Sequence, residues 1–431
     1  MPYNTIDLPR PGGGIRTRRR RTAGIVAALS AGLMLTAAPV AHADTVIDTI
    51  DVGDDPSGVA ITPDGTRAYV TNFRGETVSV IDTTTNKVTT TIAVGDYPRA
   101  VAITGTRAYV TNNDDGTVSV IDTTTNKVTT TVDVGKEPSG VAITRDGTRA
   151  YVTNEGGTVS VIDTATNKVT TTIAVGGTAT GATITRDGTR AYVTDGPNDV
   201  VSVIDTATNK VTSTIAVGDF PRGVAITGTR AYVTNRRDDT VSVIDTTTNK
   251  VTTTIAVGDY PGAVAITPDG THAYVTNNDD DTVSVIDTTT NKVTTTIDVG
   301  NGPSGVAITP DGTHAYINNW SDDTVSVIAI DQAPTVVGTP PAGAVGQPYE
   351  YAFTLTGQPA PVTKLTLGTL PDGLTLSGDG VLSGTPTTAG QFEFTVTAGN
   401  GIGDDANLPV VLEITDTPPT GSLGSLESWG S

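Results

Sequence analysis

The chain has no cysteine, and this absence restricts both its chemistry and the ways in which it can be stabilised. It excludes disulfide bonds, thiolate metal ligands and a thiol nucleophile. Aromatic residues are also rare, at 4% of the 431 residues, so the side chains of Val, Ile and Thr must fill much of the interior. Because β-branched residues favour extended strands, the composition predicts sheets around a large core.

Basic residues are few as well, since 26 Lys and Arg face 46 Asp and Glu. Residues 1–43 combine a basic segment, an apolar run and the ending Ala41-His42-Ala43. The run is short and interrupted for a membrane span, so the pattern predicts a signal peptide that is cleaved before Asp44. The protein is therefore expected to be secreted or extracytoplasmic, with association with the cell surface as an open alternative.

Cleavage would remove six Arg and one Asp, which takes the net charge from −20 to −25. So acidic a surface repels phosphate groups, and this excludes nucleic acid as a partner. No stretch of the mature chain is long and apolar enough to cross a bilayer, so we expect no transmembrane segment there.

The motif Tyr-Val-Thr-Asn organises the chain. It recurs seven times, twice as a variant, with starts at Tyr69, Tyr109, Tyr151, Tyr192, Tyr232, Tyr274 and Tyr316. In the first repeat, short apolar segments at 58–62, 67–72, 77–81 and 87–94 are separated by turn residues. Four strands in a repeat of about 40 residues are typical of a β-propeller blade.

The two ends of the repeat region complement each other. The seventh repeat stops after its third strand-like segment, and residues 45–53 carry the pattern of a fourth segment before the first repeat begins. We therefore predict that the N-terminal strand completes the last blade and closes the ring, which removes exposed sheet edges. The prediction is an all-β fold with a seven-bladed propeller at 44–331.

The repeated Tyr-Val-Thr-Asn, followed by Thr-Val-Ser-Val-Ile-Asp-Thr and Val-Gly-x-x-Pro-x-Gly-Val-Ala, resembles the YVTN-family β-propeller repeat proteins over residues 45–331. The resemblance implies an extracytoplasmic propeller, related in shape to surface-layer proteins and to the propellers of quinoprotein dehydrogenases and lactonases. The motif carries no catalytic residue, so the resemblance assigns none to this chain.

The composition changes after the repeats. Alternating apolar residues at 332–416 predict a small Ig-like β-sandwich. The stretches 370–374 and 380–386 resemble the Ig-like domains of bacterial surface proteins. Residues 417–431 are rich in Pro, Gly and Ser and are predicted to be disordered.

The mature chain has two histidines, His272 and His314, at a position where the other five repeats have Arg. We interpret both as structural and predict no catalytic residue, no metal site and no cofactor. Calcium is the one ion with weak support, from the carboxylates in the loops.

Differences between the near-identical repeats concentrate in the loop after the second strand and the loop between blades, which open on one face of a propeller, beside its channel. The candidate ligand-binding residues in these loops are Asp96, Tyr97, Asp114, Asp115, Asp219, Phe220, Asp259, Tyr260, Asp279, Asp280, Trp320 and Asp322. Exposed rings and carboxylates can bind sugars or cations. The alternative is that Asp and Asn are simply good turn residues.

These observations favour a secreted or cell-surface binding scaffold without catalytic activity, monomeric, whose partner is an envelope glycan or protein. The alternative is a propeller enzyme of the lactonase or quinoprotein-dehydrogenase type, using loop carboxylates such as Asp114, Asp239, Asp279 and Asp322 at the channel mouth. A subunit of a surface coat is a third hypothesis.

Overall fold

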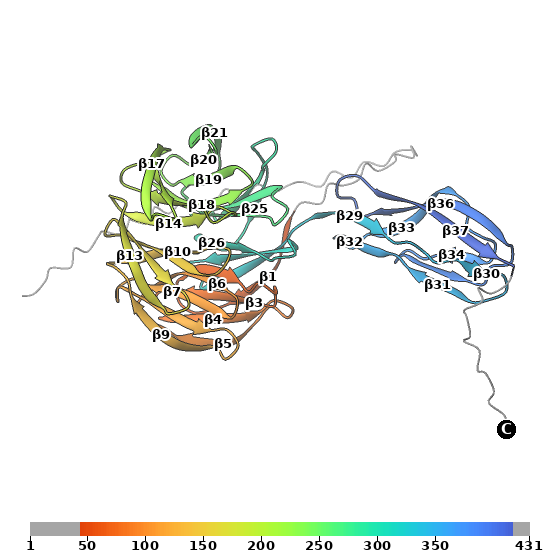
Figure 1. Ribbon diagram of the computed structural model, residues 1–431, viewed down its shortest axis with the longest axis horizontal. Coiled ribbons are helices and arrows are strands. Elements are labelled where there is room, and N and C mark those ends of the chain that lie inside the picture. Colours follow the sequence, from red (N-terminus) through yellow and green to blue (C-terminus); the bar gives the residue numbers. More distant parts are fainter. Residues whose placement is uncertain (1–43, 417–431) are drawn as a thin grey trace, which may run out of the picture. The chain divides into compact units, whose positions relative to one another are not determined.

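The computed structural model describes residues 44–416, and every regular element in this range is a strand (Figure 1). The predicted all-β fold, a propeller followed by an Ig-like sandwich, is confirmed. The predicted signal peptide and disordered tail lie outside the described residues. Among residues 44–416 no helical segment has the length and apolarity that a membrane span requires.

Seven sheets of four antiparallel strands occupy residues 45–329 and are called sheets 1 to 7. Sheet 1 has β2 (Pro56–Ile61), β3 (Arg67–Asn72), β4 (Thr77–Asp82) and β5 (Lys87–Ala93). Sheet 2 has β6 (Pro98–Thr104), β7 (Arg107–Asn112), β8 (Thr117–Asp122) and β9 (Lys127–Asp133). Sheet 3 has β10 (Pro138–Ile143), β11 (Arg149–Asn154), β12 (Thr158–Asp163) and β13 (Lys168–Ala174).

Sheet 4 has β14 (Ala179–Ile184), β15 (Arg190–Asp195), β16 (Val200–Asp205) and β17 (Lys210–Ala216). Sheet 5 has β18 (Pro221–Thr227), β19 (Arg230–Asn235), β20 (Thr240–Asp245) and β21 (Lys250–Ala256). Sheet 6 has β22 (Pro261–Ile266), β23 (His272–Asn277), β24 (Thr282–Asp287) and β25 (Lys292–Asp298). Sheet 7 has β26 (Pro303–Ile308), β27 (His314–Asn319), β28 (Thr324–Ala329) and β1 (Thr45–Asp51).

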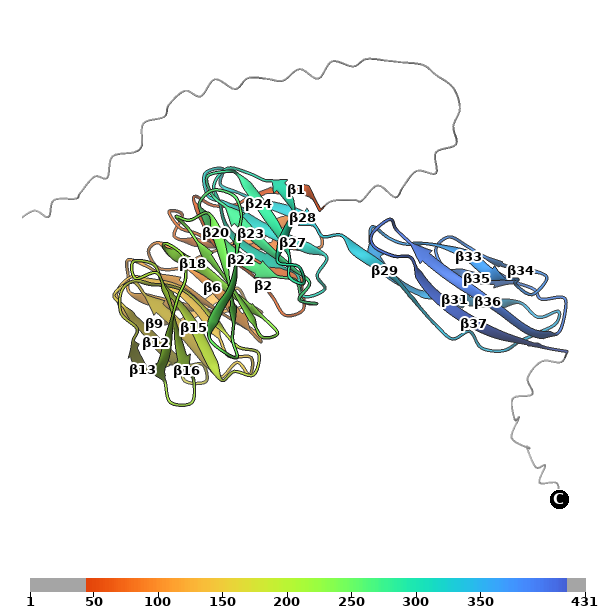
Figure 2. The same ribbon diagram turned by 90° about the horizontal axis from the view of Figure 1, so that it is seen from above.

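The ring closes through the first strand of the chain. β1 pairs antiparallel with β28, so it supplies the fourth strand of sheet 7. The first strands of successive sheets contact one another in order, and β26 of sheet 7 contacts β2 of sheet 1. Figures 1 and 2 show the sheets side by side in the propeller region.

The apolar core lies between neighbouring sheets. Tyr69, Val78 and Val80 of sheet 1 pack against Val110 and Ile121 of sheet 2, all of them fully buried. Equivalent clusters fill all seven interfaces. Alternate residues of one strand point to opposite faces, so each sheet must pack on both sides, and a ring of sheets satisfies this requirement.

Each residue of the repeated motif has a defined place in these interfaces. The hydroxyl of Tyr69 donates to Asn126 Oδ1 of the next sheet at 2.6 Å, and that of Thr71 donates to the carbonyl of Arg99 at 2.8 Å. The amide of Asn72 donates within its own sheet to Thr77 and Ser79. The motif therefore recurs because most interfaces use the same buried hydrogen bonds, which are costly to leave unmade.

The C-terminal region forms a sandwich of its own. One sheet contains β30 (Gly343–Ala344), β37 (Ala406–Thr415), β36 (Gly390–Gly399) and β33 (Val362–Gly368). The others contain β31 (Tyr349–Ala352), β35 (Val381–Gly384) and β34 (Leu374–Leu376), and β29 (Gln332–Val337) with β32 (Thr354–Gln358). Leu382, Val396 and Leu412 are fully buried in its core.

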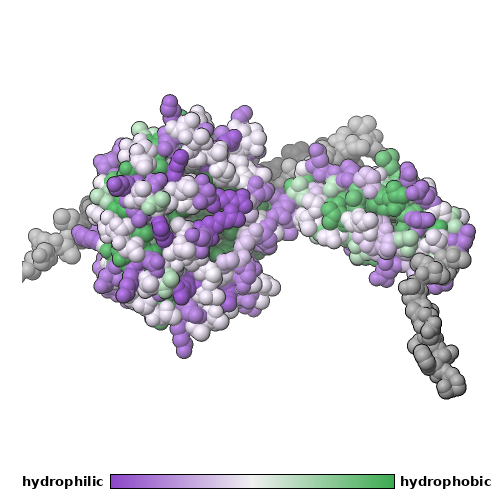
Figure 3. Space-filling view, viewed as in Figure 1, coloured by the Kyte–Doolittle hydropathy of each residue, from purple (hydrophilic) through white to green (hydrophobic). Residues whose placement is uncertain are grey.

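The two regions differ in their surfaces. Hydrophilic and near-neutral side chains cover most of the visible face of the propeller, whereas an apolar patch is visible on the C-terminal sandwich (Figure 3). Exposed apolar side chains there include Val362 and Leu367 of β33 and Val411 of β37.

Candidate functional site at the channel mouth

The two variable loops of each sheet lie side by side on one face. The backbone N–H of Phe73, after β3, donates to the carbonyl of Asp55, before β2, at 2.9 Å. The same bond joins Arg236 to Phe220 at 3.1 Å. The residue that follows each motif is thereby held next to the start of the first strand, where the channel opens.

A cavity of about 690 Å³ occupies the channel mouth, within the range of small-molecule sites. First strands contribute the residue after Pro or its equivalent: Ser57, Arg99, Ser139, Thr180, Arg222, Gly262 and Ser304. Loops after the second strands contribute Phe73, Glu155, Arg236, Asn278 and Trp320. These two positions vary between repeats that are otherwise almost identical, so the variation concentrates where a ligand would bind.

Arg99 is the arginine of this cavity that has a carboxylate partner. Its Nη1 donates to Glu155 Oε1 at 2.5 Å, and both side chains keep partial exposure. Its guanidinium group also lies 5.5 Å from the centre of the Phe73 ring. The ion pair joins sheet 2 to sheet 3, and Arg99 neutralises much of the negative charge of Glu155.

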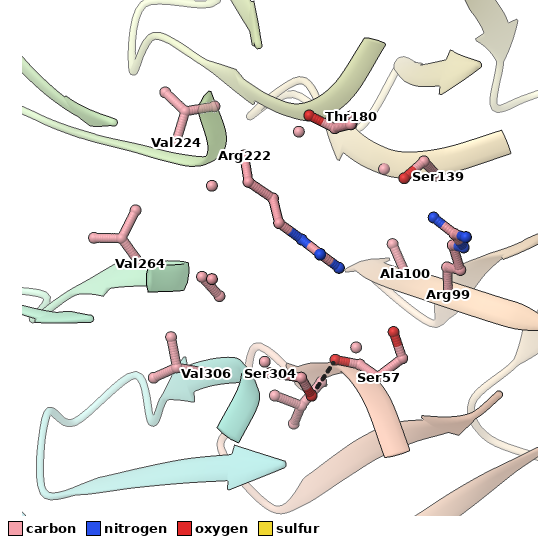
Figure 4. Close-up of a pocket in the computed structure, with 18 of the residues that line it drawn as sticks. Ser57, Arg99, Ala100, Ser139, Thr180, Arg222, Val224, Val264, Ser304 and Val306 are labelled. Atoms are coloured by element: carbon pink, nitrogen blue, oxygen red, sulfur yellow. Dashed lines mark hydrogen bonds between the residues drawn. The ribbon is translucent and has the colours of Figure 1, made fainter. Parts of the chain in front are cut away.

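Arg222 lies deeper, on β18, and extends across the cavity towards Arg99 and Ala100 (Figure 4). Among residues 44–416 no acceptor lies within hydrogen-bond distance of its guanidinium group. Burial, and repulsion from Arg236 and Arg99, lower the pKa of Arg222 to about 9, against the weaker attraction of Glu155. The group is still cationic at neutral pH, and an anion beside it would relieve this repulsion.

Arg236 is the third cation. Its guanidinium group stacks 3.8 Å from the centre of the Tyr260 ring, and its Nε atom is buried without a hydrogen-bond acceptor among the described residues. Burial lowers the pKa of Arg236, while Tyr260 and Asp279 raise it. Three arginines and one carboxylate, that of Glu155, therefore line a cavity in a chain whose net charge is −20.

Aromatic side chains form the rim beside these cations. Phe73 lies 4.8 Å from Tyr97 and 5.1 Å from Trp320, measured between ring centres. The guanidinium carbon of Arg237 lies 4.5 Å from the centre of the Phe220 ring. Of the four predicted aromatic residues, Phe220 and Trp320 line the cavity, while Tyr97 and Tyr260 pack against residues that do.

Several predicted carboxylates join loops to each other. Asp115, Asp280 and Asp322 each accept the backbone N–H of a residue in the loop that precedes the first strand of the same sheet, at 2.9, 2.8 and 2.7 Å. In the loops after β19 and β27, a carboxylate reaches the following sheet. Asp239 accepts the N–H of Tyr260 at 2.8 Å, and Asp323 that of Asp55 at 2.8 Å.

The remaining predicted carboxylates lie outside the 690 Å³ cavity. Asp219 is 3.7 Å from Arg237, Asp114 borders a separate groove, and repulsion from Asp280 and Asp239 raises the pKa of Asp259. Among residues 44–416 the carboxylates of Asp96 and Asp279 accept no hydrogen bond and form no ion pair, although Asp279 attracts Arg236. Within residues 44–416 no three acidic or histidine side chains are close enough to hold a metal ion. A ligand role for these carboxylates stays a prediction.

The sequence reasoning did not single out Arg99, Glu155, Arg222 or Arg236 as a site. A signal was present, because the residue after the strand-initiating Pro and the residue after the motif change from repeat to repeat. His272 and His314 start β23 and β27, at the opposite ends of these strands from the variable loops, and contact Thr271 and Thr313.

Both regions of the chain match models of known protein families. Residues 104–303 match the family model described as "Cytochrome D1 heme domain", and residues 333–415 match "Putative Ig domain". Among solved structures, Kuenenia stuttgartiensis hydrazine synthase is similar, with a TM-score of 0.60 and 25% sequence identity. The similarity covers 64% of this chain and 96% of that one. The search of curated proteins gave no match.

The expectation of no cofactor, or at most calcium, was wrong, because the matched propeller model is that of a heme domain. The cavity fits part of such a group. Its arginines suit acidic side chains, and Phe73 and Trp320 suit a flat ring. Its described walls contain no His, Cys or Met, so they do not fit coordination of the iron. Over residues 104–303 the propeller is thus similar to the heme domain of cytochrome d1, with a cationic and aromatic channel mouth that lacks the usual iron ligands.

Proposed function

We propose that the propeller is the ligand-binding domain of an extracytoplasmic, cofactor-dependent enzyme, and that its channel mouth binds a flat organic anion with at least two carboxylates. The observation that carries the proposal is the meeting of Arg99, Arg222 and Arg236 in one cavity with Glu155 as their only carboxylate among the residues that line it. The similarity to a heme domain and to a hydrazine synthase favours an enzyme over the scaffold that the sequence suggested.

Electrostatics supports an anion rather than a neutral ligand. Arg222 and Arg236 have no carboxylate bonded to them within the described residues. A guanidinium group binds a carboxylate through two parallel hydrogen bonds, which are stronger in a site shielded from water. Two free arginines therefore favour a ligand with two acidic groups, and binding would offset the mutual repulsion that lowers the pKa of Arg222.

The rim supports a flat ligand. Phe73, Tyr97 and Trp320 form one aromatic cluster next to Arg99. Stacking on such a cluster contributes affinity for a conjugated ring. A porphyrin with carboxylate side chains has both features. Because the described cavity walls do not fit iron coordination, we expect an iron-free porphyrin to bind about as tightly as its iron complex.

The location and partners are part of the same proposal. The predicted leader at residues 1–43 and the Ig-like match at 333–415 support export and a role in the envelope. An envelope glycan or protein could bind the outer part of the loop face, where Asp96 and Asp259 lie apart from the cavity.

The binding test uses the fluorescence of Trp320. The chain has two tryptophans, so a Trp429→Phe background leaves Trp320 as the only reporter. Protoporphyrin IX should quench it, whereas the dimethyl ester, which lacks the negative charges, should bind at least 30-fold more weakly, since an unpaired buried charge costs roughly 2 kcal/mol or more.

Matched variants locate the site. Arg222→Gln and Arg236→Gln should each weaken binding by about 30-fold or more. Arg186→Gln is the control, because it removes the same charge from an exposed turn away from the cavity. Equal affinity for acid and ester, or equal loss in all three variants, would overturn the proposal.

A further inference from the structure

The channel changes character below the arginines. Each first strand contributes one residue to the channel mouth, such as Ser57 or Arg222, and a second residue two positions later. These second residues are Val59, Val101, Val141, Ala182, Val224, Val264 and Val306. All seven line the same cavity as the arginines. Figure 4 shows Val224, Val264 and Val306 on neighbouring strands around it. We call this set the valine ring.

The valine ring is deeper in the channel than the arginines. Each first strand starts at the loop face and runs away from it, so Val224 lies further along β18 than Arg222, beyond the register shift between Pro221 and Val224. Between them stands Gly223, and the equivalent position in every other sheet is Gly or Ala. No bulky side chain at this intermediate position separates the charged level from the apolar one.

The valine ring is only partly covered by the protein. Six of its seven members keep intermediate exposure, and Val101 alone is buried, at 8%. Their outer neighbours, such as Val70 and Val110, are completely buried between sheets. The free apolar surface of the ring therefore faces the cavity, where covering it with an apolar group would be favourable.

We propose that the ligand of the channel is an amphiphilic anion, with its acidic end at Arg222 and Arg236 and an apolar arm in the valine ring. This inference rests on the proposed function and narrows its ligand class. A wholly polar anion would leave the valine ring in contact with water. A neutral apolar molecule would leave two partly covered guanidinium groups without a partner.

The ring also indicates where the arm lies. Ala182 replaces the valine in sheet 4, the sheet whose first strand also lacks the initial Pro. The smaller side chain leaves additional space on that side of the channel. The arm is therefore expected to lie against Ala182, across the ring from the wall formed by Val306 and Val59.

The test is isothermal titration calorimetry of residues 44–431 with straight-chain carboxylates from acetate to decanoate. Each added methylene that is buried should raise the affinity about fourfold, and the increase should stop once the chain outgrows the valine ring. Citrate, which has more charge and no apolar arm, should gain nothing from the ring and bind no better than the short carboxylates.

Two kinds of variant separate the levels of the channel. Val224→Thr with Val264→Thr should flatten the dependence on chain length and leave acetate and butanoate unchanged. Arg222→Gln should weaken every carboxylate by a similar factor. Val251→Thr is the control, because it places the same hydroxyl on an exposed outer strand. The melting temperature of each variant checks that it is folded.

The outcomes distinguish the two proposals. If short and long carboxylates bind equally while protoporphyrin IX still binds, the amphiphile is ruled out and the proposed function stands. If the dependence on chain length survives both valine substitutions, the arm does not lie in the valine ring and the inference is overturned. If neither carboxylates nor protoporphyrin IX bind, the proposed function itself fails.

Discussion

Replacing His314 by arginine should strengthen the ring at its seam. At five interfaces, an arginine at the start of the second strand donates to a backbone carbonyl in the next sheet. Arg149, for example, donates to the carbonyl of Thr206 at 2.6 Å. At the interface between sheets 7 and 1 the same position is His314, although the equivalent acceptor exists. The carbonyl of Thr83 there accepts the hydroxyl of Tyr316 at 3.4 Å.

The magnitude follows from the bond that is added. A hydrogen bond from a charged donor contributes about 1.5–3 kcal/mol, and ordering the arginine side chain offsets roughly 1 kcal/mol of this. The His314→Arg variant should therefore gain about 1 kcal/mol. The measurement is unfolding in urea. The gain should raise the midpoint concentration without changing the dependence of the unfolding free energy on urea, because the surface exposed on unfolding is unchanged.

The reciprocal variant makes the reasoning refutable. Arg149→His removes an existing bond and should lose stability by about the same 1 kcal/mol. Arg186→His, in an exposed turn, is the control and should stay within about 0.5 kcal/mol of the parent. If His314→Arg and Arg149→His both behave like the control, the arginine bonds do not stabilise the ring.

Other predictions concern pH, the loops and the closure. Burial lowers the pKa of His314, so its neutral form stabilises the fold above about pH 6.5, and this contribution is lost as the pH falls below that value. In the His314→Gln variant, the midpoint of urea unfolding should therefore depend less on pH in this range. Hydrogen bonds lower the pKa of Asp64 and Asp187 to about 2, so the double Asp→Asn variant should lose less stability than the parent as the pH falls from 4 towards 2. Asp280→Ala should cost about 1 kcal/mol in urea unfolding and leave protoporphyrin binding unchanged, whereas a ligand role would weaken binding. Deleting residues 45–51 should expose the edge of β28 and produce aggregates in size-exclusion chromatography, unless the ring is stable when open.

Most of the propeller could be predicted from the sequence because its period repeats the same physical requirement. Each sheet must bury both faces, so each repeat shows the same alternation, and the agreement of seven copies outweighs the ambiguity of one short strand. The pairing of β1 with β28 followed from a missing strand at one end and an additional strand at the other.

The channel site was harder to predict because its residues are isolated in the sequence. Arg99 and Arg236 belong to repeats that are three sheets apart, and each is a single substitution in its own repeat. Only the ring brings them together. Backbone partners are equally hidden, so the sequence could not show that Asp115 and Asp322 accept N–H groups from neighbouring loops.

The way in which the ring closes sets the order of events during folding. The carboxylate of Asp44 accepts the N–H of Asp331, 287 residues away, at 2.8 Å, and also binds the hydroxyl of Tyr274. At the other six interfaces an Asn in a turn holds this tyrosine, so Asp44 replaces a turn that sheet 7 does not have. β1 is the first strand to be synthesised, but it can pair only after β28, the last strand of the propeller, has been synthesised. Contacts this distant slow folding. Until synthesis reaches residue 329, β1 has no partner strand, and a chaperone or a second chain could capture it.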